Sequence, residues 1–260
     1  MTFPVAHLRR SIHSNFSLKT FKKMKRLKFL SLAATLLFAA QTLDAQKFLE
    51  PSYTFSEKKV SYLTMDDGTE MEVYVRSFKR EKGLIEEIKV ENKEGKKVKI
   101  KPEEIKFMYL PQSGWDKFTK AYDFLTDAQK WDNKEIDQGR VAEGYIYFEK
   151  ATVQVKKEKM TLMMQLLNPS FCSKMRVYHD PFAKETASLG IGGITVAGGD
   201  DKSYYVAAGG DPAYKLMKKN YEEEFPKLFG KCDSVKKKFG KDVRWGDFEV
   251  HVYEQSSACK

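Results

Sequence analysis

Apolar and polar residues alternate in short runs between residues 60 and 109. In the run "TEMEVYVRSF", Met71, Val73 and Val75 are separated by Glu72 and by other polar or amphipathic side chains. This period of two is typical of strands with one buried face. Several such runs follow one another closely, which predicts a small N-terminal β-barrel-like unit over residues 46–111.

Turn residues separate these runs. Asp66–Gly68 ("DDG") and Asn92–Gly95 ("NKEG") each lie between two alternating segments and predict hairpins. Pro102 interrupts the last run, because proline lacks the N–H that a strand ladder needs.

The apolar period changes to a helical one at Ser113, a suitable N-cap. The segment 113–131 is predicted to be a helix whose aromatic stripe belongs to the core. The apolar positions of that stripe are Trp115, Phe118, Tyr122, Leu125 and Trp131. The polar run 132–140 after this segment is predicted to be a loop.

A second strand-rich stretch begins near Tyr145. "EGYIYFEKATVQV" alternates, and the segment 160–179 is predicted to form two strands around a turn at Asn168–Ser170, although 160–167 also fits a short helix. These runs predict a second antiparallel sheet.

The segment 189–211, "LGIGGITVAGGDDKSYYVAAGGD", is rich in glycine. A dinucleotide-binding loop needs G-x-G-x-x-G between a strand and a helix. Gly190 and Gly192 fit, but Thr195 occupies the third position and a β-branched run comes next. The stretch therefore predicts strands and turns, with a helix starting at Asp211–Pro212, and no cofactor is expected.

The C-terminal segment has helical spacing. Asn220 with Glu223 predicts a helix start, Pro226 is expected to kink or interrupt that helix, and 233–239 predicts a further helix ended by Gly240. The tail after Arg244 fits either a strand or a helix. The sequence thus predicts an α+β fold: the N-terminal β unit, a helix, the second sheet and a C-terminal helical cluster, with residues 112–260 as one α+β unit.

Residues 1–45 have the layout of a targeting segment. A basic stretch from Met24 is followed by an apolar run over 29–40, and Ala45 precedes Gln46, the predicted cleavage point of a signal peptide. The apolar run is shorter than the ~20 residues of a membrane span, so no retained span is expected, although an anchor is the alternative. Met24 is the expected true start. Residues 1–23 would then be untranslated, or else an organelle presequence.

This segment also explains the charge. The chain has a formal net charge of +10, but residues 1–45 contain eight Lys or Arg and one acid, which leaves +3 for the remainder. The other basic clusters are interleaved with acids, so a nucleic-acid partner is not expected.

Three cysteines lie in the predicted mature chain, and export permits disulfides. Cys232 and Cys259 bracket the C-terminal segment and are the preferred pair, with Cys172 buried or unpaired. Three unpaired thiols remain the alternative, because sequence does not establish connectivity.

No established catalytic or metal-binding motif occurs in the sequence. His179 and His251 are the histidines of the mature chain, and neither belongs to a metal-ligand cluster. His179 is expected to form a surface pair with Asp180. The acid pairs Asp66–Asp67 and Asp200–Asp201 are expected at turns, and no catalytic residue is assigned.

The segment 198–232, together with "LLNPSFCSKMRVYHDP" before it, resembles uncharacterised secreted proteins of the Bacteroidetes. In those proteins a signal peptide ending in Ala-Gln precedes a small β unit, a Tyr-rich strand and a helical tail containing Y-x-x-x-F-x-x-L-F. The resemblance implies export and one α+β architecture, and it brings no activity.

These observations predict an exported, soluble, non-catalytic envelope protein, periplasmic or secreted, that binds an envelope protein or ligand. The alternative is an exported hydrolase of envelope polymers that acts through loop carboxylates.

Overall fold

The computed structural model describes residues 48–113, 135–183 and 203–259. The chain divides into two compact units, Met1–Ala45 and Gln46–Lys260. The first unit, with Met24, Ala45 and the apolar run, lies outside the described residues. The second unit has an α+β fold, as the sequence predicted.

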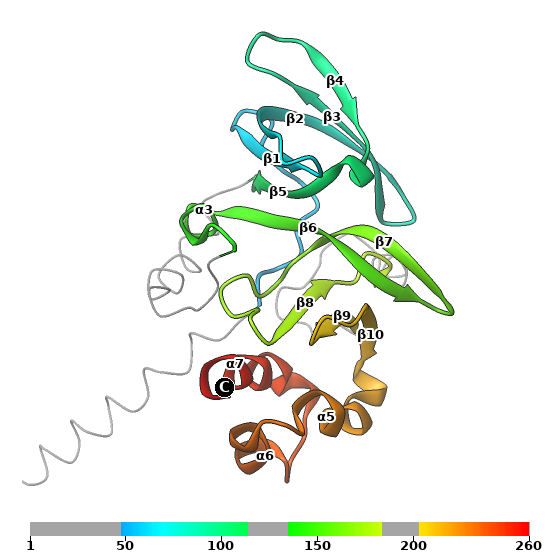
Figure 1. The fold of residues 1–260 in the computed structure, drawn as a ribbon, viewed down its shortest axis with the longest axis vertical. Helices are drawn as coiled ribbons and strands as arrows, with labels where there is room; N and C mark the ends of the chain where they lie inside the picture. The colour runs from blue at the N-terminus through cyan, green and yellow to red at the C-terminus, as the bar shows by residue number, and fades with distance from the viewer. Residues whose placement is uncertain (1–47, 114–134, 184–202, 260) are drawn as a thin grey trace, which may run out of the picture. The chain divides into compact units, whose positions relative to one another are not determined.

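The strands and helices follow one another along the chain (Figure 1). The strands are β1 (Ser61–Met65), β2 (Glu70–Glu81), β3 (Leu84–Glu91), β4 (Lys97–Ile100), β5 (Ile105–Pro111), β6 (Tyr145–Val155), β7 (Glu158–Gln165), β8 (Met175–His179), β9 (Ser203–Ala208) and β10 (Ala213–Met217). The α-helices are α3 (Gln138–Ala142), α5 (Tyr221–Phe229), α6 (Asp233–Phe239) and α7 (Phe248–Ala258), and a 3-10 turn, η1, covers Pro102–Glu104.

The described strands form one mixed sheet rather than two sheets. Its order is β4-β3-β2-β1-β5-β6-β10-β9-β8, and β7 pairs with β6. Strand β5 pairs with β6 in the register Tyr109↔Tyr147, so the sheet continues past residue 111. Only the short β6–β10 contact is parallel among the described pairs. The expectation of a separate antiparallel sheet was wrong. The backbones of β5 and β6 are hydrogen bonded to each other as neighbouring antiparallel strands, and this pairing joins the N-terminal strands to the later ones. These pairings do not close the sheet, and the barrel-like N-terminal unit stays a prediction.

The period-two pattern determines which face of the N-terminal strands is buried. Val73 and Val75 point into a core with Ile88 and Met108, while Glu72 lies on the opposite face. Both predicted hairpin turns are present, with Gly68 and Gly95 at positive φ between β1 and β2 and between β3 and β4.

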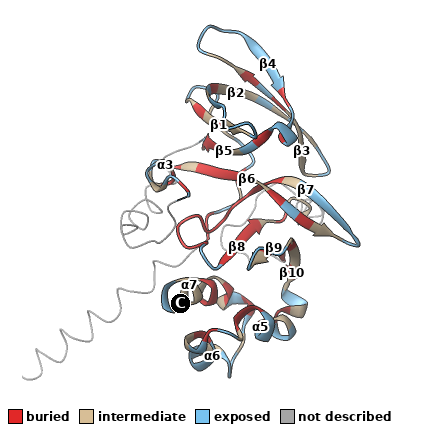
Figure 2. Ribbon diagram, in the orientation of Figure 1, coloured by how far each residue is buried: buried red, intermediate tan, exposed pale blue. Residues whose placement is uncertain are grey.

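The C-terminal helices cover one face of β8–β10 (Figures 1 and 2). Val177, Val206 and Leu216 of these strands share a buried core with aromatic residues of the helices, among them Phe229 and Phe248. No helix of the described residues is both long and apolar enough to cross a bilayer.

The helix predicted at Asp211–Pro212 is wrong. Gly209 and Gly210 have φ values of 66° and 85°, and this turn leads directly into strand β10. Tyr214 pairs with Val206 of β9 and with Gln154 of β6. The sheet hydrogen bonds therefore outweigh the local preference of Asp-Pro for a helix start.

Two segments whose sequence fitted either a strand or a helix each adopt one of these structures. Residues 158–165 form strand β7, and the tail forms helix α7. The run 132–140 was predicted to be a loop, but its end forms the start of helix α3, which is capped by the Asp137 side chain. Helix α5 continues through Pro226, so the helix is not interrupted there. The missing N–H of proline would have bonded only to a residue of the first turn. The predicted helix at 113–131 lies outside the described residues after Ser113.

Candidate functional site

A small pocket lies where the β2–β3 hairpin meets the ends of β7 and β8. Its walls include Tyr53, Arg80, Phe148, Met163, Gln165 and His179, and its volume is about 20 Å³. We call it the hairpin pocket. Met163 also lines a neighbouring pocket, so the two lie along one seam between the hairpin and β7.

The turn of the β2–β3 hairpin determines how close the hairpin approaches β8. Lys82 and Gly83 have φ values of 48° and 86°, as in a two-residue hairpin turn. A Cβ added to Gly83 would lie 1.9 Å from the carbonyl oxygen of Pro181, just after β8. Glycine is thus required both by the backbone conformation and by the contact that forms the pocket.

Arg80 is half-buried in this pocket. A β-bulge shifts the β2–β3 register between Lys79 and Arg80, and bulges commonly redirect a side chain. The Arg80 Nη1 donates to the Gly83 carbonyl at 3.3 Å, whereas its buried Nη2 has no hydrogen-bond partner among the described residues. Burial lowers the pKa of the Arg80 guanidinium, and the nearby Tyr53 only partly opposes that effect. Arg80 forms no ion pair with a described carboxylate.

His179 lies on the wall of the pocket next to Tyr53. The Tyr53 hydroxyl and the His179 Nε2 are hydrogen bonded at 2.9 Å, and the two rings meet edge to face at 5.5 Å. Burial lowers the pKa of His179 to about 4; the Arg80 charge adds to this and Asp180 opposes it. His179 is therefore neutral at pH 7, and Arg80 supplies the positive charge of the pocket.

The expected surface pair of His179 and Asp180 is wrong. Asp180 is fully buried and points to the other side of the strand. Its carboxylate accepts from the Ser203 hydroxyl at 2.7 Å and pairs with Lys215 at 2.7 Å. Adjacent residues in an extended chain face opposite sides, so the pair could not form at the end of β8.

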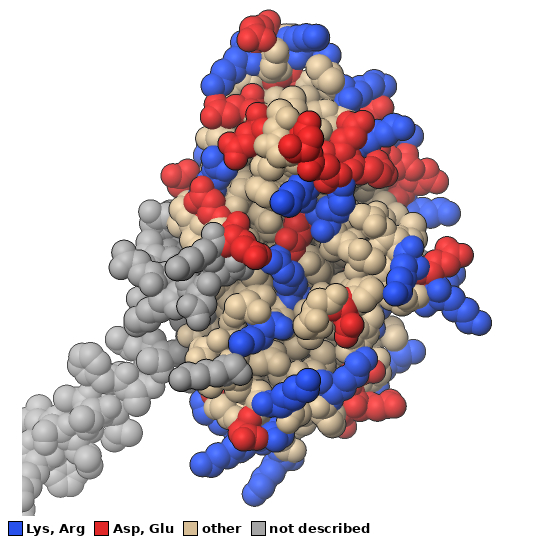
Figure 3. Space-filling model, viewed as in Figure 1, with Lys and Arg blue, Asp and Glu red and all other residues tan. Residues whose placement is uncertain are grey.

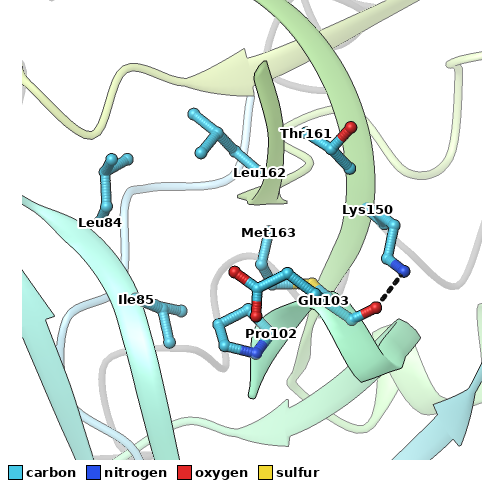
Figure 4. A pocket seen from close by; sticks show the side chains of 8 residues that line it. All are labelled: Leu84, Ile85, Pro102, Glu103, Lys150, Thr161, Leu162 and Met163. Carbon is cyan, nitrogen blue, oxygen red and sulfur yellow. Dashed lines mark hydrogen bonds between the residues drawn. The ribbon is translucent and has the colours of Figure 1, made fainter.

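The second pocket on the seam is shown in Figure 4. Its volume is about 30 Å³, and Leu84, Ile85 and Leu162 make part of its lining apolar. Lys150, on its wall, donates to the Glu103 carbonyl and to the Asp66 carboxylate. The positive charge here is thus already neutralised, in contrast to that of Arg80.

A set of polar side chains lies on the opposite face of β6. Arg176 donates to both oxygens of Glu149, at 2.7 and 2.6 Å, and to Glu135 at 2.9 Å. The Tyr178 hydroxyl donates to Glu149 at 2.7 Å. We call these four residues the Glu149 cluster; its arginine is paired within the chain.

The cysteines form the pair that the sequence favoured. Cys232 and Cys259 are joined by a disulfide with a Cα–Cα distance of 5.6 Å. The bond links the residue before α6 to the residue after α7, while Cys172 is buried and its thiol contacts the Pro169 carbonyl at 3.6 Å.

The remaining candidates do not converge on a site. Asp67 caps its turn by accepting from the Thr69 N–H at 2.8 Å. His251 lies in the C-terminal core, far along the chain from His179 and among aromatic rings. No group of three or more metal-ligating side chains occurs in the described parts of the chain. Asp200–Asp201, Ala45 and Gln46 fall outside those parts.

The sequence patterns did not point to Tyr53 or Arg80. The available signal was the Lys82–Gly83 pair between two alternating runs, which indicates a two-residue hairpin. Such a hairpin would have placed Arg80 near a tip, but not against β8.

The charge on one face of the molecule is mixed (Figure 3). Lys and Arg are interspersed with Asp and Glu there, and no large area has a single sign. The comparisons with known proteins add no assignment: no family model, curated protein or solved structure matches this chain.

Proposed function

We propose that this is an exported protein, periplasmic or secreted, that binds a partner or ligand without catalysing its conversion, and that the hairpin pocket takes part in binding. The observation that carries the proposal is the buried Nη2 of Arg80, which lacks a hydrogen-bond partner in the part of the chain that the structure describes, in a pocket with an open side. Tyr53, at that pocket, is 37% exposed. A buried polar atom without a partner is costly, and a ligand that bonds to it removes the cost.

Three observations support export. The segment before Gln46 has the layout of a signal peptide, and the Cys232–Cys259 disulfide suits an oxidising compartment. The likeness to secreted proteins of the Bacteroidetes agrees with both.

A hydrolase of envelope polymers is less well supported. It needs an acid with a raised pKa and room for a sugar or peptide. The two pockets described above have volumes of about 30 and 20 Å³, well below those of ligand-sized clefts. The described carboxylates with a shifted pKa all shift downward, as in Glu72 beside Lys93 and Glu254 beside Lys238.

Export is tested by expressing the chain from Met24 in a Gram-negative host and sequencing the N-terminus of the exported product. We expect a mature chain beginning at or within a few residues of Gln46. Retention of the protein in the cytoplasm, or an intact N-terminus, would contradict export.

Binding is tested by cross-linking and pull-down from the envelope fraction with wild type, Arg80→Met and Arg76→Met. Arg76 lies on the same strand but pairs with Glu91 at 3.2 Å, so it is a matched control. We expect one set of partners with wild type and Arg76→Met that is lost with Arg80→Met. If all three proteins capture the same set, the hairpin pocket is not the binding site.

A further inference from the structure

We propose that the hairpin pocket binds a carboxylate group, held by Arg80 and by the hydroxyl of Ser52. This inference rests on the proposed binding function and names the chemistry of the ligand. The charge of the pocket, its donors and its size each support a carboxylate.

The charge of the pocket favours an anion. Every other arginine described in the same sheet has an acid close to it: Arg76 pairs with Glu91, and Arg176 pairs with Glu149 and Glu135. Arg80 is half-buried and has no such acid among the described residues. A guanidinium that is partly removed from water without a counter-charge is unfavourable, and a bound anion would offset that cost.

The donors of the pocket match a carboxylate. The Nη2 of Arg80 has no partner within residues 48–113, 135–183 and 203–259, and an arginine offers its N–H groups in a planar fork that suits two oxygens. Ser52, also on the wall, accepts from the Gln112 Nε2 at 2.8 Å, and no acceptor for its own hydroxyl proton is found in the described segments. Both groups donate, whereas a carboxylate only accepts.

The size of the pocket limits the ligand. A cavity of 10–15 Å³ holds about one water, so the pocket, at about 20 Å³, admits a group of one or two atoms while the rest of the ligand stays outside. One edge of a planar carboxylate fits this limit better than a tetrahedral sulfate or phosphate. Phe148 and Met163 make part of the pocket's lining apolar, which strengthens the interaction between opposite charges.

The test is a titration of the purified, isotope-labelled protein with sodium acetate, followed by amide and arginine side-chain NMR signals. Sodium chloride and sodium sulfate at matched ionic strength are run in parallel. We expect saturable shifts with acetate at Gly83 and at the Arg80 side chain, and no saturable shifts with the other salts. Absence of saturation with acetate, or equal curves with chloride or sulfate, would overturn the proposal.

Variants identify the groups that bind. Arg80→Met should weaken acetate binding about ten-fold or more, because it removes a charge-assisted hydrogen bond. Ser52→Ala should weaken it less, and Arg76→Met should leave it unchanged. Spectra of each free variant report whether it is folded, and unchanged acetate affinity in both Arg80→Met and Ser52→Ala would refute the assignment.

The source of the carboxylate is distinguished with two short peptides. One has a free C-terminus and neutral side chains, and the other has a glutamate and an amidated C-terminus. Tighter binding of either peptide than of acetate supports the proposal and names the source. If acetate and both peptides fail to bind while envelope partners are still captured, the carboxylate assignment is wrong and the binding function stands.

Discussion

Two half-buried arginines of one sheet have opposite surroundings. Arg176 on β8 is held by Glu149 and Glu135, and Tyr178 completes the Glu149 cluster. The one hydrogen bond that Arg80 on β2 makes among the described residues goes to the carbonyl of its own hairpin turn, and it pairs with no described carboxylate. A charge that is paired within the chain contributes to the fold, whereas an unpaired one is a cost that folding alone does not explain. The difference identifies the hairpin pocket as the functional candidate.

The largest expected effect is the removal of a partner from the Glu149 cluster. Glu149→Gln leaves the Arg176 guanidinium without its bidentate carboxylate in a partly buried place, and should lower the free energy of unfolding by about 3 kcal/mol. Urea denaturation measures this. Glu72→Gln is the control, since Glu72 pairs with Lys93 at the surface and should change stability little. Equal effects of the two substitutions would remove the contrast between paired and exposed charges.

The second prediction concerns the contact that forms the pocket. Gly83→Ala should lower the free energy of unfolding by about 2 kcal/mol or more. The new Cβ would clash with the Pro181 carbonyl, and the positive φ of this residue is unfavourable for alanine. Gly95→Ala has a similar φ of 82° but nothing within 4 Å of its Cβ, so about 1 kcal/mol is expected. If Gly95→Ala is as damaging as Gly83→Ala, the close approach of the hairpin to Pro181 is not significant for stability.

The fold was predictable where local chemistry and sheet pairing agree. The hairpins at Asp66–Gly68 and Asn92–Gly95 follow from their turn residues, and helix α6 follows from its spacing and Gly240. The prediction of a helix at Asp211–Pro212 was wrong because the pairing of β10 with β9 and β6 is not visible in a local pattern. The join of β5 to β6 was missed for the same reason.

The candidate site was less predictable than the fold. Tyr53, Arg80 and His179 come from three separate parts of the chain, and the hairpin, β8 and the segment before β1 bring them together. Nothing near Arg80 in the sequence indicates that it lacks a counter-charge. That fact depends on the positions of all nearby acids, which only the folded chain determines.

The third prediction uses protonation to compare His251, in the buried core, with His179, at the hairpin pocket. His251 is fully buried among aromatic rings and bonded to the Tyr221 hydroxyl; burial lowers its pKa to about 4, with Arg244 adding to this and Asp247 opposing it. A histidine with a lowered pKa contributes stability above its unfolded value of about 6.5, and that contribution is lost as the pH falls toward 4. By pH 5.5, His251 should account for a loss of about 1 kcal/mol.

Denaturation between pH 7 and pH 4.5 measures this loss, and His251→Gln should flatten the curve. His179 has a similar pKa, but it lies at the hairpin pocket with Tyr53, Arg80 and Asp180 around it. Acetate bound there should raise the pKa of His179 and leave that of His251 unchanged, as histidine NMR signals would show. Equal responses of both histidines to acetate would mean that the ion acts generally rather than in the pocket.

The smallest expected effect is that of Arg80→Met without a ligand. Methionine keeps the apolar part of the side chain and removes a charge that no described carboxylate pairs with, so the free energy of unfolding should change by less than about 1 kcal/mol or rise. Arg176→Met should instead lower it by about 3 kcal/mol, because Glu149 would lose its counter-charge. At an acetate concentration of about ten times the wild-type dissociation constant, wild type should gain about 1.4 kcal/mol, and Arg80→Met, which binds about ten-fold or more weakly, should gain about 0.4 kcal/mol or less. A loss of stability in Arg80→Met as large as that in Arg176→Met would show that Arg80 stabilises the fold itself, and the contrast between the two arginines would then no longer indicate a binding site.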